Sequence, residues 1–339
     1  MQFSARVHVL KPLPLFGRLP FESHARMTEY FSSARQIRFR GSEYHDGEFI
    51  SVRIVEPKLS PAPSRQLWEE RVEYDLLFET SLQFPGAKAI TARSSDGLES
   101  PKSPSEKRHL WSKHIAPRSL KLCVNTYLLS LEFSYPSISF GASEYRAGRT
   151  LLFHDKTLFS TLAESLKYLQ GNNIDPVVDL TPDTVWKWMS TKNGVFSGFS
   201  DTPASRSLSY FTRLYNTSFR NDELSDLVWA LASIEALLVD SGRSSVGQLT
   251  AKLGCLFSGH NSRQFMVDQI EKTYGFRSKM IHGNRQVLSV FRRDELEPDK
   301  RFSEEYDSIR YAVGIAFILI QRLIRDNGKN FSFRLVLDQ

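Results

Sequence analysis

Two side chains able to act on a phosphate lie five positions apart at the end of one predicted helix. Apolar residues recur at helical spacing from about 264 to 282, and Gly283 marks the end of that pattern. Arg277 falls on the apolar line, and His282 falls in the last turn. An imidazole titrates nearest to neutral pH, and beside a fixed cation it suits phosphoryl chemistry.

The charge of Arg277 needs a partner, because an unpaired charge on a buried helix face is very costly. Glu235 is a second such charge, four positions after Leu231 and three before Leu238 on the apolar line of an earlier helix. We predict that Glu235 pairs with Arg277 across the helices. The pair either orients the guanidinium for catalysis or is a purely structural ion pair, with His282 then only capping its helix.

The Arg-x-x-x-x-His spacing has little specificity by itself. It recurs at Arg40/His45, in an extended stretch, and at Arg149/His154, in a predicted strand. Positions five apart on a strand point to opposite faces. Only the helical pair combines the spacing with a capping glycine and a place on the apolar line, so its context makes it the candidate.

The elements that must position these side chains are predicted as five helices in the last third of the chain. Asn221-Asp222 caps the helix of Glu235, and Ser303-Glu304-Glu305 caps the final helix, which Gly328 ends. Five helices with short links form a bundle large enough to bury its own core. Two more helices are predicted before it, at 158–171 and at 181–194.

The first half is predicted to be rich in strands. Polar and apolar residues alternate in places over 3–10 and 50–55, and the apolar run Leu120–Phe133 has the β-branched and aromatic content of a strand or hairpin. Ser94–Lys107 lacks large apolar residues and is predicted as a loop. The expected fold class is α+β, with a β-rich N-terminal domain followed by an all-α bundle.

Two domains are therefore expected. Residues 1–200 form the β-rich domain with a helical connector, as a sensor or substrate-binding region, and residues 203–339 form the bundle.

Composition limits the function classes. The 339 residues include 44 basic and 38 acidic ones, and this net charge of +6 modestly favours a polyanion as partner. No apolar run reaches the roughly 18 residues that cross a bilayer, and residues 1–16 do not fit a secretory signal. Two cysteines, Cys123 and Cys255, are too few for a disulfide scaffold or a zinc site. We expect a cytoplasmic protein with no membrane partner, no metal and no cofactor.

The residues around the helix end resemble a known family. Tyr274–Gly283 resembles the Tyr-x-x-Arg-Ser-x-x-x-His-Gly signature of the Apea-like branch of the HEPN superfamily. Ser233–Leu238 resembles the earlier helix of that branch, with its glutamate, and the order of the helices is the same. The resemblance covers roughly 203–328 and not the first half. No tyrosine stands two positions after His282, because Asn284 is there, so the HEPN toxins silenced by modifying such a tyrosine are a poor guide.

The resemblance implies a HEPN-like helical bundle that forms a homodimer and acts as a metal-independent endoribonuclease, in anti-phage defence or as a toxin. It implies Arg277 and His282 as the catalytic pair, with Glu235, Ser278 and Asn284 in support. RNA is the expected partner, with tRNA or another structured RNA as candidates, together with a regulatory or trigger protein.

The chemistry of RNA agrees with these roles. A 2′-hydroxyl attacks the neighbouring phosphate once its proton is removed, and the leaving 5′-oxygen takes up a proton. The products are a 2′,3′-cyclic phosphate and a 5′-hydroxyl, and DNA, which lacks the 2′-hydroxyl, is not cut. One bundle has one such histidine, and a two-fold dimer brings a second Arg277/His282 pair to supply both proton roles.

Two other interpretations stay open. A non-catalytic HEPN module that binds RNA, a nucleotide or a partner protein keeps its function when His282 becomes alanine. A plain structural bundle, whose first half does the work, keeps its function when the chain is cut after about residue 200. In such a protein Ser278 is an ordinary surface residue and Asn284 a turn residue.

Overall fold

The computed structural model describes the backbone in fifteen segments, and the side chains in the greater part of the helices. The described residues are 3–10, 38–44, 48–67, 70–83, 116–134, 136, 140–147, 150–156, 160–175, 180–191, 201–215, 223–240, 245–259, 261–284 and 300–333.

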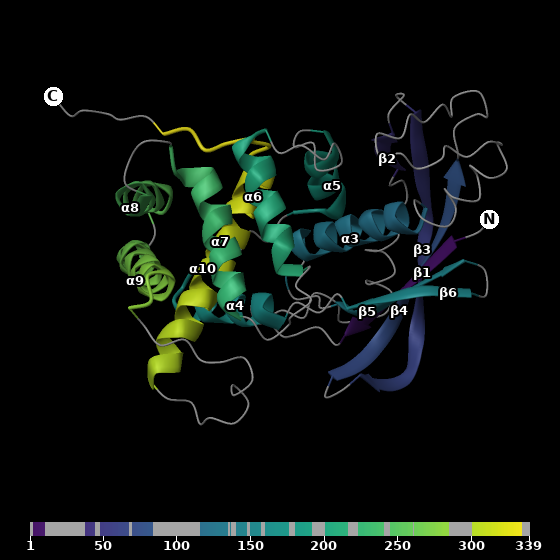
Figure 1. Cartoon of the computed structure of the whole chain (residues 1–339), viewed down its shortest axis with the longest axis horizontal. Helices are drawn as coiled ribbons and strands as arrows, with labels where there is room; N and C mark the ends of the chain where they lie inside the picture. The colour runs from purple at the N-terminus through teal and green to yellow at the C-terminus, as the bar shows by residue number, and fades with distance from the viewer. Residues whose placement is uncertain are drawn as a thin grey trace.

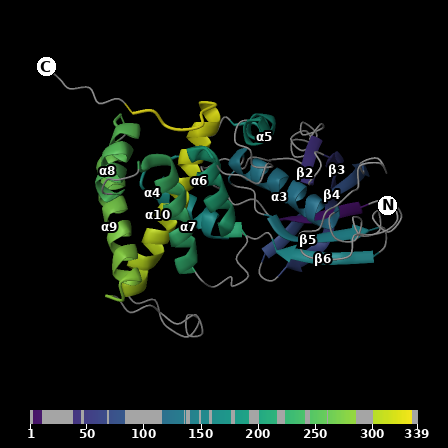
Figure 2. The same ribbon diagram turned by 45° about the horizontal axis from the view of Figure 1, so that its top comes forward.

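Six antiparallel strands form one sheet in the order β2-β3-β4-β1-β5-β6. Their bounds are β1 Phe3–Leu10, β2 Arg38–Tyr44, β3 Glu48–Leu67, β4 Glu70–Gln83, β5 Phe140–Ala147 and β6 Thr150–Lys156. β1 lies between β4 and β5, with Phe3 opposite both Thr80 and Ala147. The sheet lies at one end of the molecule, and α8 (Ser245–Leu256) and α9 (Arg263–Ile281) lie at the other (Figures 1 and 2).

The helices between these ends pack around α10 (Lys300–Arg325). The others are α3 Ala116–Ser134, α4 Ser160–Gly171, α5 Pro182–Thr191, α6 Pro203–Phe211 with the 3₁₀ turn η3 Thr212–Tyr215, and α7 Glu223–Leu238. Every residue of α10 from Tyr311 to Gln321 is buried, because α4, α7 and α9 all pack against this helix. A helix that is apolar on all sides belongs in the middle of a bundle.

The expected fold class, a β-rich N-terminal domain followed by an all-α bundle, is wrong. Where the structure describes side chains as well as backbone, 79% of the residues are helical and the only strand is a short piece of β5. The first 200 residues contribute α3, α4 and α5, and the buried core includes Phe133, Leu166 and Trp188 from these helices.

The apolar run Leu120–Phe133 is the main cause of this error, because it forms α3 and not a strand or hairpin. An apolar run without a clear period fits a buried strand and a buried helix equally well, and only its length separates them. At 19 residues α3 is far longer than an ordinary strand. Tyr127, Leu131 and Phe133 are fully buried along it, and the polar residues Ser130 and Glu132 are buried too, so burial does not divide the described part of α3 into an apolar and a polar face.

The helical core extends across the predicted boundary near residue 200. Leu162, Leu166 and Leu169 of α4 belong to the same core as Phe317 of α10, and the indole of Trp188 on α5 donates a hydrogen bond to the carbonyl oxygen of Gly328 at 2.8 Å. The division into domains at 1–200 and 203–339 stays a prediction.

Most helix ends agree with the sequence. The final helix begins at Lys300, one turn before the predicted cap, and Asn327, not Gly328, adopts the left-handed conformation after it, with φ of 52°. The predicted loop Ser94–Lys107 lies outside the described residues. Among the described helices, none has both the length and the apolar character to cross a membrane.

Candidate functional site

The predicted pair between Glu235 and Arg277 is present in the structure. Glu235 lies near the end of α7, and its Oε1 accepts a hydrogen bond from Nη1 of Arg277 on α9 at 3.2 Å. Both side chains are about one quarter exposed, at 25% for Glu235 and 24% for Arg277. The pair is therefore partly open to solvent and is not sealed in the core.

Tyr274, one turn before Arg277, joins this pair. Its hydroxyl donates to Oε1 of Glu235 at 2.6 Å and accepts from Nη1 of Arg277 at 3.2 Å. The guanidinium carbon of Arg277 also lies 5.4 Å from the centre of the Tyr274 ring, within reach of a cation–π contact. Three polar atoms thus form a closed triangle of hydrogen bonds between α7 and α9.

The sequence pattern places Tyr274 on the apolar line and gives no sign of what its hydroxyl does. The signal that could have found it is its spacing of three from Arg277, which puts the two side chains on neighbouring turns of one helix face. Burial raises the pKa of Tyr274 from its ordinary value of 10.0, and the hydrogen bond to Glu235 raises it further. The phenol therefore stays protonated and remains a donor to the carboxylate.

His282 is the C-cap of α9. Its backbone N–H bonds to the carbonyl oxygen of Ser278 at 3.0 Å, and the next residue, Gly283, has φ of 71°. The N–H groups of Gly283 and Asn284 return to the carbonyls of Met280 and Lys279, which is the Schellman arrangement. The prediction that Gly283 ends the helix at His282 is confirmed.

The His282 side chain is not hydrogen-bonded to the Arg277 cluster. It is exposed, and among the described residues no group forms a hydrogen bond with the imidazole. Five helical positions correspond to about 140° of rotation, so the two side chains leave α9 in different directions. Within one chain the structure brings Glu235, Tyr274 and Arg277 together but does not add His282 to them.

Ser278 and Asn284, the predicted supports, are both exposed. Among the described residues neither side chain makes a hydrogen bond, and the backbone N–H of Asn284 bonds to the carbonyl of Lys279 at 2.8 Å. Asn284 thus has a clear role in the turn after α9.

The expectation that the whole apolar line of α9 faces the core is only partly met. Met266 and Ile270 are fully buried, whereas Ile281 is 56% exposed. The buried residues of α9 end at Phe276. Arg277 therefore lies on the inward side of the helix at the point where α9 extends past the core, which explains how a guanidinium can stay on this face.

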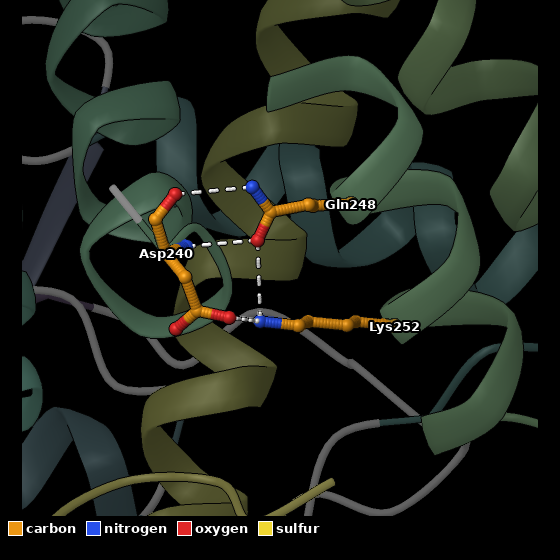
Figure 3. A network of polar contacts seen from close by, with 3 residues as sticks. All are labelled: Asp240, Gln248 and Lys252. Atoms are coloured by element: carbon orange, nitrogen blue, oxygen red, sulfur yellow. Dashed lines mark hydrogen bonds and ion pairs between the residues drawn. The ribbon is translucent and has the colours of Figure 1, made fainter. Parts of the chain in front are cut away.

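A second polar network holds α8 against the end of α7 (Figure 3). The backbone N–H of Asp240 donates to the side-chain oxygen of Gln248 at 2.8 Å, and the Gln248 amide donates to the Asp240 carbonyl at 3.0 Å. Nζ of Lys252 lies 2.6 Å from the Asp240 carboxylate. These bonds fix the first turn of α8, whose first residue, Ser245, lies near enough to lower the pKa of Tyr274.

Within the described part of the chain, His, Cys, Asp and Glu side chains do not gather in groups of three or more that could hold a metal ion. The Glu235–Tyr274–Arg277 cluster has one carboxylate against one guanidinium, so the only carboxylate it could offer a cation is already paired.

Comparison with known proteins gives no relative: no protein-family model, curated protein or solved structure matches this chain.

Proposed function

We propose that this chain is a metal-independent endoribonuclease that cuts RNA to 2′,3′-cyclic phosphate and 5′-hydroxyl ends. The observation that supports it best is the position of the Arg277 guanidinium at the partly exposed end of α9. Its Nη1 donates hydrogen bonds to Glu235 and to Tyr274, which fix it there. A planar guanidinium fixed in this way can bind two phosphate oxygens and stabilise the charge that develops on them. His282, at the C-cap of the same helix, is the proposed acid or base.

The free edge of Arg277 favours a phosphate as ligand. Both hydrogen bonds of the guanidinium come from Nη1, and its Nε is enclosed by protein atoms. Nη2 makes no hydrogen bond among the described residues, and the side chain as a whole is 24% exposed. Nη2 is therefore the donor through which we propose that Arg277 binds a phosphate oxygen.

The lack of a hydrogen bond between His282 and the Arg277 cluster is the reason to propose a homodimer. Each chain offers one such histidine, about 140° of helix rotation away from Arg277, so we infer that a second copy related by two-fold symmetry supplies the histidine opposite each guanidinium. The proposed setting is the cytoplasm, where the enzyme acts in anti-phage defence or as a toxin. The proposed RNA is tRNA or another structured RNA, and a regulatory or trigger protein is the proposed further partner.

A second candidate, a non-catalytic HEPN-like module that binds RNA, a nucleotide or a partner protein, also has an observation in its favour. No described residue orients the His282 imidazole, whereas general acid–base catalysis requires a placed proton donor or acceptor. Such a module would use Arg277 to bind a phosphate and leave the strand intact.

Sequencing of RNA ends in a bacterial host that expresses the protein separates the two candidates. The nuclease predicts new 5′-hydroxyl ends with wild type and their loss with His282→Ala. Lys272→Ala, an exposed change on the same helix, serves as control and should leave the ends unchanged. The same RNA ends with wild type and with His282→Ala would favour the binding module.

A further inference from the structure

The hydroxyl of Tyr274 joins a carboxylate on α7 to a guanidinium on α9. It donates to Glu235 Oε1 on α7 at 2.6 Å and accepts from Arg277 Nη1 on α9 at 3.2 Å. A phenol has one O–H to donate and two lone pairs to accept with, so Glu235 takes its donor and Arg277 takes one lone pair. Ser245, the first residue of α8, lies near enough to lower the pKa of Tyr274.

Tyr274 restricts the orientation of the Arg277 guanidinium through two contacts. Its oxygen shares Nη1 with Glu235, and its ring lies 5.4 Å below the guanidinium carbon. The carboxylate alone would leave Arg277 free to turn about a single hydrogen bond at 3.2 Å. With both contacts, Tyr274 restricts the rotation of the Arg277 guanidinium and so determines which of its N–H groups point toward a ligand.

We propose that Tyr274 is a positioning residue that sets the orientation of Arg277 toward a phosphate of the RNA. This inference rests on the proposed function and deepens it, because it assigns the geometry of the phosphate contact to a residue that need not touch the substrate itself. The Asp240–Gln248–Lys252 network fixes the first turn of α8, whose first residue, Ser245, lies near Tyr274.

A double-mutant cycle tests whether Tyr274 acts through Arg277. The variants are Tyr274→Phe, which keeps the ring and removes the hydroxyl, Arg277→Ala, and the two together. Tyr210→Phe is the control, because Tyr210 is also half-buried and its hydroxyl makes no hydrogen bond among the described residues. Each protein is melted to check its fold and is assayed for kcat and KM on a mixed RNA pool.

The expected result is a fall in kcat of about tenfold for Tyr274→Phe and a smaller loss of RNA affinity of about threefold, since Arg277 holds the phosphate in the bound state and more strongly in the transition state. In the Arg277→Ala protein the same change should have no further effect. An equal effect of Tyr274→Phe in both backgrounds would overturn the inference, because a merely structural tyrosine does not depend on Arg277.

RNA affinity measured in the His282→Ala protein separates this inference from the nuclease proposal. An affinity that Tyr274→Phe lowers only while Arg277 is present supports the positioning role, even if the wild-type protein cuts no RNA and the nuclease proposal fails. If Tyr274→Phe changed neither the RNA affinity nor the cleavage rate, the positioning role would be overturned.

Discussion

Arg277 on α9 donates a hydrogen bond from Nη1 to Oε1 of Glu235 on α7 over 3.2 Å. The two residues are 42 positions apart in sequence, and the contact joins two helices at the place where α9 leaves the core. Without this contact Arg277 would be an unpaired charge on the inward face of α9. The contact fixes Nη1 of the guanidinium and leaves Nη2 without a hydrogen bond among the described residues. The proposed chemistry depends on this contact more than on the spacing to His282.

Loss of the Glu235 charge should impair function more than folding. In Glu235→Gln the amide keeps the shape of the side chain, but Arg277 loses its ionic partner and turns more freely. We expect RNA cleavage to fall about tenfold, and the free energy of unfolding by about 1 kcal/mol, as for a partly exposed ion pair. Rates of cleavage and urea denaturation provide the two measurements.

The matched control is Glu164→Gln. Glu164 pairs with Arg310 at 2.9 Å in a second, more exposed ion pair between α4 and α10. This change should leave cleavage as it is in the wild type. Equal losses of cleavage in the two variants would show that the Glu235 contact has no special role.

The glycine inside α9 and the glycine just after it, Gly275 and Gly283, should respond to alanine in opposite directions. Gly283 has φ of 71°, where a Cβ is strained, although nothing lies within 4 Å of the added atom. Gly275 is helical and also has open space around it. We expect Gly283→Ala to destabilise the protein by about 1 kcal/mol and to displace His282, and Gly275→Ala to stabilise it by up to about 1 kcal/mol.

Thermal melting and RNA cleavage of both glycine variants check this prediction. Stability that falls in Gly275→Ala would contradict a regular helix at that position, and stability that does not change in Gly283→Ala would contradict the left-handed turn after α9.

Stability should decrease as pH rises because of Glu132. This carboxyl lies buried on α3, and burial raises its pKa from 4.5 to about 8, although a 2.5 Å hydrogen bond from the Tyr215 hydroxyl lowers it. Since the folded pKa lies above the unfolded one, the stabilisation is complete below about pH 4.5 and is lost as pH rises to about 8. Glu132→Gln should flatten this dependence and be more stable than wild type at pH 8.

Melting curves between pH 5 and 9 test the effect of Glu132, with Glu164→Gln as the exposed control. If wild type and Glu132→Gln lost stability in parallel over this range, the buried carboxyl would not be the cause.

Packing of α4 on α10 should be sensitive at Gly314. A Cβ at this position would lie 2.5 Å from Cδ1 of Leu169 and 3.2 Å from the carbonyl oxygen of Ser165. Gly314→Ala should therefore destabilise the protein by about 1–3 kcal/mol through overpacking. Urea denaturation gives this value, and an unchanged midpoint would mean that α4 does not pack closely against α10 at this glycine.

The sequence predicted well those elements whose apolar residues have a clear helical period. The spacing of Leu162, Leu166 and Leu169 predicts α4. The start of α5 is predicted by Thr181-Pro182-Asp183, and the end of α9 by Gly283. The contact between Glu235 and Arg277 was also predictable, because two charges on apolar lines each need a partner.

Other features lack such a signal. α3 is buried on most sides, and polar residues such as Ser130 and Glu132 stand among its buried apolar ones, so no clear period distinguishes a buried helix from a strand. The hydroxyl of Tyr274 is invisible to a hydropathy pattern that counts tyrosine as apolar. The exposure of Ile281 depends on where the neighbouring helices end, which is a property of the tertiary packing and not of α9 itself.

The most direct test of the central claim is cleavage of a mixed RNA pool by the purified protein and its His282→Ala variant, with EDTA present throughout. We expect wild type to cut the RNA despite the chelator, the products to end in 2′,3′-cyclic phosphate, and His282→Ala to cut little or none. Equal cleavage by the two proteins, or loss of wild-type cleavage on chelation, would contradict a metal-independent nuclease that uses His282.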